Sequence, residues 1–308
     1  MTQSKPLGLT TLILFVFSNA MMMNYITYKQ NVDLEPVVLA SVASLASIII
    51  ALPLFLFNRS PPLTAVSSKR LIKPYLWITL FTFTCWTSGY TALLNLNPAA
   101  VAAIALAVSA LIMALTDVLK LGRLGRLGVV GSMLALGTVW VLSTSYSSVI
   151  QGAGLHDDYE LEIGVTFSIA CGISLYFIAL LSKRLNDLGQ SFHKIQVRRS
   201  LFAFLVCTTI GLLDGALATI ISEAPQLAAL TVLFLILMQS ALVLSIRTIS
   251  RPILTVGFAG TALYTLIAQL AFFQQSVDSL MVITILGNAL GVVLMSFVQT
   301  KSNLTCQR

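Results

Sequence analysis

One acidic side chain lies in a part of the sequence where a carboxylate is costly. Asp214 falls within residues 211–216, inside a long apolar run that we predict to be a helix spanning a membrane. At ~1.5 Å per residue, such a helix places Asp214 about 22 Å from Arg199 and about 13 Å from Glu223, within the hydrocarbon layer. An intramembrane carboxylate is a functional candidate by default, as a proton-coupling or cation-binding group. The alternative is an acid that reaches the outer interface past the small Gly215.

Amide and aromatic side chains that interrupt the apolar runs form a second group of candidates. Buried amides are costly in lipid unless they find partners, so we expect them to face the interior of a helix bundle. Some would line a cavity for a small-molecule substrate, and others would join neighbouring helices. The candidates are Asn19, Asn24, Tyr25, Trp86, Tyr90, Tyr176, Gln239, Tyr264, Gln269 and Asn288.

Motifs for enzymatic chemistry are missing from the sequence. It contains no GxxxxGK[ST] phosphate-binding loop, no HExxH and no GxSxG. The four cysteines form no CxxC pattern, and His156 and His193 fall in predicted loops. We therefore expect a protein that is not an enzyme and that carries neither a cofactor nor a metal.

The elements that must position these residues follow from composition. The 308 residues are 57% hydrophobic and 9% charged, whereas soluble domains carry about 25% charged residues. The apolar residues form runs of the ~20 residues that a helix needs to cross a bilayer. We predict an all-α integral membrane protein with ten spans, near 7–28, 37–57, 74–94, 98–119, 127–147, 162–182, 199–222, 226–246, 252–273 and 279–299.

The loop charges predict the orientation of these spans. With both termini in the cytoplasm, all 18 Lys and Arg residues except Lys29 fall on the cytoplasmic side. The net charge of +7 is then explained by topology, and a nucleic-acid partner is not required. Cleavage of the first span as a signal peptide is the weaker alternative, because its apolar run is long enough to span a membrane.

The ten spans divide into two equal sets. The longest predicted external loop, near 148–161, separates five spans in residues 1–150 from five in residues 151–308. An odd number of spans per half makes the halves enter the membrane in opposite orientations. This arrangement predicts an inverted repeat, with a substrate site at the midplane between the halves.

The stretch from Gly89 to Ile104, with its Asn97-Pro98 turn and alanine-rich continuation, resembles the third and fourth spans of the drug/metabolite transporter superfamily. Asp117, the glycines that follow it (Gly125, Gly128 and Gly131) and the sixth span from Gly164 to Arg184 fit the same pattern. The resemblance is to ten-helix members built from two EamA-like repeats. It implies a basket of helices around a central cavity. The chain departs from the family at residues 40–42, which lack its second-span arginine, and at Gln274 or Gln275, which replaces an acid.

These observations predict a secondary carrier of small metabolites in the inner membrane, with export favoured over import. No Lys or Arg falls inside a predicted span, away from its ends, which favours a neutral, zwitterionic or cationic solute and permits proton coupling. The alternatives are a flippase for a lipid-linked headgroup, a nucleotide-sugar carrier, and a membrane protein without transport activity. The small-residue motif from Gly287 to Gly291 favours close packing within one chain, and the choice between monomer and homodimer stays open.

Overall fold

The computed structural model describes residues 5–28, 35–57, 68–121, 126–144, 158–216, 229, 232–238, 240–241, 257, 260–274 and 277–305. Within these ranges the chain forms nine defined helices and no strand. The helices are α1 (Lys5–Tyr28), α2 (Pro36–Phe57), α3 (Ser68–Asn95), α4 (Pro98–Leu121), α5 (Arg126–Thr144), α7 (Asp158–Asp187), α8 (Phe192–Leu213), α12 (Thr261–Ala271) and α13 (Ser279–Thr305).

Six of the described helices are long and apolar enough to cross a membrane: α1, α2, α4, α5, α7 and α8. Their outward faces carry large apolar side chains that a water-soluble protein would bury. Met133 on α5 and Ile283 on α13 are both 67% exposed. Because apolar side chains of this size surround the bundle, hydrocarbon is the solvent that suits its surface. The all-helical membrane class predicted from composition is confirmed, whereas ten spans remain a prediction.

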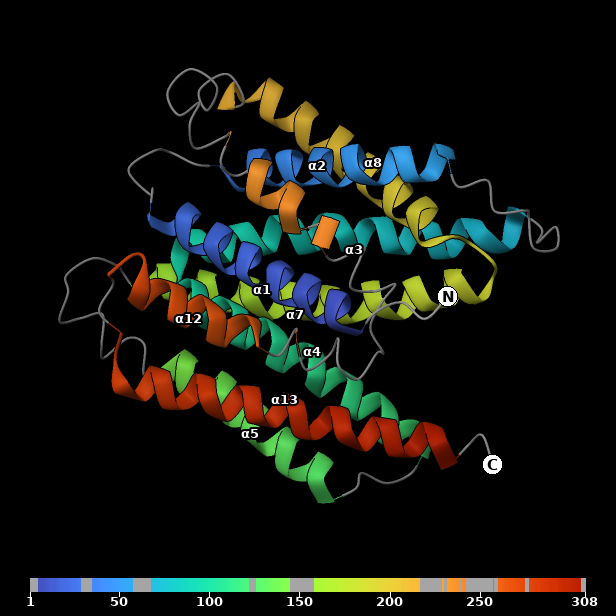
Figure 1. Ribbon diagram of the computed structural model, residues 1–308. Coiled ribbons are helices and arrows are strands. Elements are labelled where there is room, and N and C mark those ends of the chain that lie inside the picture. Colours follow the sequence, from blue (N-terminus) through green and yellow to red (C-terminus); the bar gives the residue numbers. More distant parts are fainter. Residues whose placement is uncertain are drawn as a thin grey trace.

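The helices lie side by side in one bundle, with their axes roughly along a common direction (Figure 1). The closest pairs are α3 with α7, α2 with α8, and α5 with α13. Helix α4 lies against α5, α7 and α12, and α1 lies against α12. The three closest pairs all join helices that are far apart in the sequence, so the bundle is held together by contacts between its two halves.

One end of the bundle collects the basic residues. Helix α1 begins and α13 ends at this end, where α3 and α8 also begin (Figure 1). The first turns of α3 contain Lys69, Arg70 and Lys73, and the last turns of α7 contain Lys183 and Arg184. The described helices therefore place their positive charge together, as the loop charges predict.

Helix α3 is rich in threonine and serine, yet it lies in the middle of the bundle. Its hydroxyl groups donate hydrogen bonds to carbonyl oxygens one turn earlier, at 2.7 Å from Thr82 to Ile78 and 2.9 Å from Thr87 to Phe83. Hydroxyls bonded in this way need no water or partner helix. A helix of modest hydropathy can therefore be buried without leaving these groups unsatisfied.

Glycine allows a close contact between α5 and α13. A Cβ atom on Gly131 of α5 would lie 2.7 Å from the Gly291 carbonyl oxygen of α13, and one on Gly291 would lie 3.0 Å from the Gly131 oxygen. The two backbones touch at this crossing, as small residues at membrane helix contacts permit. A Cβ atom on Gly287 would meet no other atom within 4 Å, so only one glycine of the predicted motif makes a close contact within the chain.

Helix α8 differs most from its predicted bounds of 199–222. It begins at Phe192, because the Ser191 hydroxyl accepts a hydrogen bond from the Lys194 amide and caps the helix. It ends at Leu213, before Gly215 with φ of +73°. The predicted eighth span and the start of the ninth lie largely outside the described residues.

Candidate functional site

A cluster of polar side chains lies in the middle of the bundle, where α3 meets α7 and α8. We call it the central cluster and define it as Cys85, Ser88 and Tyr90 of α3, Cys171 of α7 and Arg199 of α8. The Sγ atoms of Cys85 and Cys171 are 3.8 Å apart, and both thiols are free. Cys85 and Cys171 lie near the middle of their helices, so the cluster lies near half the depth of the bundle.

Arg199 is the charged member of the central cluster. Its Nε atom is inaccessible and has no hydrogen-bond partner among the described residues. The residue as a whole is partly exposed. Cys85 is close enough to act on the guanidinium electrostatically. A partly exposed cation therefore lies within an apolar helix, close to α3.

The position of Arg199 corrects the expectation that no Lys or Arg falls within a span. The sequence places this arginine at the first residue of a predicted span, where it would reach the interface. In the structure the helix begins seven residues earlier, at Phe192, and the apolar span runs from Phe192 to Leu213. At ~1.5 Å per residue, the extra turns move Arg199 about 10 Å along the helix from its start.

The preceding arginine behaves differently. Arg198 is exposed, and its guanidinium carbon lies 4.9 Å from the centroid of the Tyr75 ring near the start of α3. The Tyr75 hydroxyl donates a 3.2 Å hydrogen bond to the Gln190 side-chain oxygen in the loop before α8. Arg198 thus belongs to the basic end of the bundle, whereas its neighbour Arg199 reaches the Cys85 side of α3.

Carboxylates are far from the central cluster. The described acidic side chains lie at helix ends: Glu35 before α2, Glu160 and Glu162 at the start of α7, Asp187 at its end, Asp214 after α8, and Asp278 before α13. Across the described ranges no ion pair forms with Arg199. Within the described residues, therefore, no carboxylate balances its charge.

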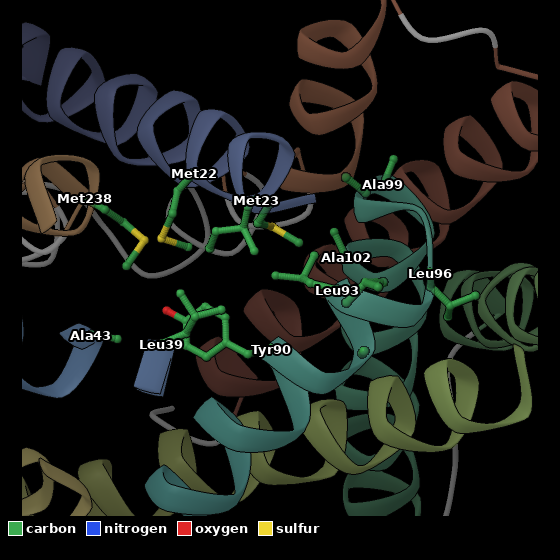
Figure 2. Packing of buried hydrophobic residues seen from close by; sticks show 14 of the residues in the cluster. Met22, Met23, Leu39, Ala43, Tyr90, Leu93, Leu96, Ala99, Ala102 and Met238 are labelled. Atoms are coloured by element: carbon green, nitrogen blue, oxygen red, sulfur yellow. The ribbon is translucent and has the colours of Figure 1, made fainter. Parts of the chain in front are cut away.

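An aromatic and sulfur-rich region adjoins the cluster. Tyr90 is 2% exposed, its hydroxyl has no described partner, and its ring stacks on Trp86 at 5.8 Å between centroids. Figure 2 shows Met22 and Met23 of α1 facing Tyr90, with Met238 beside them. Methionine side chains are flexible and polarisable, so they adapt to neighbours of different shapes.

Asp214 does not lie within a helix, which corrects its predicted position. It is the C-terminal cap of α8, with φ −83° and ψ −6°, and it is exposed. Gly215 follows in the left-handed conformation that commonly ends helices. This position matches the alternative in which the acid reaches an interface.

Three of the predicted cavity-lining side chains join helices. The Asn24 amide donates hydrogen bonds to the Ala20 oxygen at 2.9 Å and the Thr265 oxygen at 3.0 Å, connecting α1 to α12. The Asn288 amide donates to the Ala103 oxygen at 3.0 Å, connecting α13 to α4. The hydroxyls of Tyr176 and Thr116 share a 2.7 Å hydrogen bond between α7 and α4.

The remaining candidates are dispersed. Asn19, Tyr25 and Tyr264 are partly buried, and the Tyr25 ring lies 6.5 Å from that of Phe234. Gln269 is fully buried on α12, one turn after Thr265. Gln239 and the side chain of Asp117 lie outside the described residues. Of the described candidates, Tyr90 belongs to the central cluster and Trp86 stacks on it.

Sequence reasoning missed Arg199, Cys85 and Cys171 as site residues. In the sequence the cysteines resemble small apolar residues, because no pattern links them. Their proximity depends on the pairing of α3 with α7, which no local spacing encodes. A sequence signal for the position of Arg199 does exist. Ser191 is a residue typical of a helix N-cap, and a helix that begins just after it places Arg199 within the helix and not at its start. Within the described residues, no group of three His, Cys, Asp or Glu side chains could hold a metal ion.

No known family model matches the sequence, and no curated protein matches it. Solved structures do resemble it, with 27 matching chains. One of them, described only as "Crystal structure of protein", covers 96% of this chain and 100% of its own length, with 17% identity and a TM-score of 0.53. The chain therefore shares its fold with a solved structure over nearly its whole length.

Proposed function

We propose that this protein is a secondary transporter of small organic solutes, with one central site between two halves of the helix bundle. The observation that carries the proposal is Arg199, a cation within an apolar helix that forms no ion pair with any described residue. A charge in such a place is costly and marks a substrate or ion pathway by default. A purely structural protein gains nothing from a guanidinium without a partner.

The pairing of the helices supports an inverted repeat of 1–150 and 151–308. In an inverted repeat, α1, α2, α4 and α5 of the first half correspond in that order to α7, α8, α12 and α13 of the second half. When each helix is replaced by its counterpart, one observed helix contact becomes another observed contact. The pair α1–α12 becomes α7–α4, the pair α4–α5 becomes α12–α13, and α2–α8 and α5–α13 map onto themselves. This is the pattern expected of two similar halves related by a twofold axis. Rocking of such halves around a fixed site gives alternating access.

The charge distribution supports the orientation. Positive residues gather at the end where α1 begins and α13 ends, which by the positive-inside rule is the cytoplasmic end. Arg199 then lies on the cytoplasmic half of α8. A site there lies nearer the cytoplasm, and binding of a solute from that side suits export. The resemblance to the ten-helix drug/metabolite transporters agrees with this activity.

Comparative metabolite profiling tests the proposal directly. Metabolites inside and outside cells are compared between the wild type and an empty vector, with Arg199→Gln and Arg198→Gln at matched membrane levels. We expect one solute class to be redistributed by the wild type and by Arg198→Gln. No difference between wild type and vector, for any solute or gradient, would overturn the transporter proposal. Selective copurification of a lipid-linked headgroup in that case would instead favour a flippase.

A further inference from the structure

We propose that Arg199 binds the anionic group of the transported solute, and that this solute is a small carboxylate with an apolar or aromatic body. This inference rests on the proposed transport function, because it names the substrate class of the same site. It revises the preference for a neutral or cationic solute, whose basis was the expected absence of a cation within a span.

The Arg199 guanidinium has a hydrogen-bond donor, Nε, without an acceptor among the described residues. A guanidinium carries five N–H donors in a planar fork that matches a carboxylate, and it stays charged at any working pH. In the described part of the chain, nothing accepts a hydrogen bond from Nε. A carboxylate bound at the fork would supply both the missing acceptors and the missing negative charge.

The Arg199 charge is also partly accessible. Cys85 and Arg199 are both partly exposed, while Ser88, Tyr90 and Cys171 around them are buried. Neither residue lies at the end of its helix. The guanidinium is therefore positioned to meet a solute that enters the bundle.

The side chains next to the central cluster are aromatic and apolar. Trp86 and Tyr90 stack on each other, and Met22 and Met23 face Tyr90 (Figure 2). These groups suit an apolar or aromatic body and offer no second charge. A phosphate dianion usually requires more than one basic partner, and Arg199 is the only one that the described residues bring to the cluster. A monoanion with an apolar body fits this combination best.

Thiol labelling of Cys85 tests this inference without knowledge of the natural solute. A variant with Cys171→Ala, Cys207→Ala and Cys306→Ala leaves Cys85 as the single thiol. It is labelled with anionic MTSES and cationic MTSET, each rate being divided by that of a free thiol. We expect MTSES to be favoured at least fivefold, Arg199→Gln to remove this preference, and Arg198→Gln to keep it.

A pair of probes with the same ring tests the substrate class. Benzoate at millimolar concentration should slow MTSES labelling severalfold, whereas benzylamine should not, and Arg199→Gln should abolish the protection. Arg199→Lys keeps the charge and should keep part of the MTSES preference, which provides a second variant if Arg199→Gln folds poorly. Equal normalised rates for the two reagents, no labelling of Cys85 by either, or protection by benzylamine alone would overturn the inference.

The two proposals can fail separately. Charge-selective labelling with no redistribution of any metabolite would leave an anion site in a protein that is not a transporter. Transport of a solute without an anionic group, combined with labelling that does not depend on charge, would leave a transporter whose site is not built around Arg199.

Discussion

Two regions of the bundle differ in how they are packed: the contact between α5 and α13, and the central cluster. At the crossing of Gly131 and Gly291 the two backbones touch, and the surrounding Ala135, Val292 and Met295 are buried and apolar. At the central cluster, the Arg199 Nε and the Tyr90 hydroxyl are buried without a described partner. The α5–α13 contact is formed by closely packed apolar groups, whereas the central cluster contains buried polar atoms without a described hydrogen-bond partner.

This difference indicates which part of the molecule is scaffold and which part does chemistry. Within a membrane, helices gain stability from close packing and from satisfied polar groups. The α5–α13 contact draws its stability from close packing. Unsatisfied polar groups are costly, so under the proposed function a bound solute would complete the hydrogen bonding of the central cluster.

The largest expected effect comes from filling the α5–α13 contact. Gly131→Leu introduces a side chain whose first carbon would lie 2.7 Å from the Gly291 carbonyl oxygen. Backbone cannot move aside cheaply, so we expect a loss of about 1–3 kcal/mol of stability, together with a lower melting temperature and yield. Thermal unfolding in detergent, followed by fluorescence size-exclusion chromatography, measures this.

Gly287→Leu is the matched control, because a Cβ atom at this position would have no other atom within 4 Å. The same substitution here should leave the melting temperature within error of the wild type. If both variants unfold alike, the close contact is not what stabilises the pair, and the contrast between the two regions fails.

The second prediction concerns movement at the central cluster. Cys85 and Cys171 belong to different halves, and their Sγ atoms, 3.8 Å apart, would need to approach to about 2.05 Å to form a disulfide. Copper phenanthroline with oxygen removes two electrons and two protons from the thiols. We expect the resulting disulfide to reduce flux of the profiled solute at least tenfold, with recovery on adding dithiothreitol.

Cys171→Ala in the same oxidant should keep its flux, which separates cross-linking from general damage. Full transport by a protein whose disulfide is verified by mass spectrometry would show that α3 and α7 move as one unit. The two regions would then differ in polarity but not in mobility.

Tyr90→Phe is expected to have a smaller effect, which differs between stability and flux. The variant removes a buried hydroxyl that has no described partner, so stability should be unchanged or rise by about 1 kcal/mol. If the hydroxyl contacts the solute, flux should fall about threefold to tenfold in the same protein. A loss of stability without loss of flux would contradict the assignment of Tyr90 to the site.

The sequence predicted the membrane class and most helix positions because these depend on local composition. Helix α4 begins at Pro98 as predicted, since proline suits a first helical turn. The central cluster could not be predicted in this way, because the proximity of Cys85 to Cys171 depends on the pairing of α3 with α7. The ends of α8 were misplaced because apolar runs mark where lipid lies, whereas Ser191 and Gly215 determine where the helix begins and ends.

Asp214→Asn should have the smallest effect, less than twofold on flux at any external pH. The side chain is exposed at the end of α8, so neutralising it removes no buried charge and leaves no partner unsatisfied. Gly215→Ala provides a comparison, because φ of +73° at this position should cost an L-residue about 1–2 kcal/mol. This variant should therefore lose stability, whereas Asp214→Asn should not. Flux measured across a series of external pH values provides the decisive test. A tenfold loss in Asp214→Asn, or a lost pH dependence, would return the coupling role to this acid and show that the end of α8 takes part in the transport cycle.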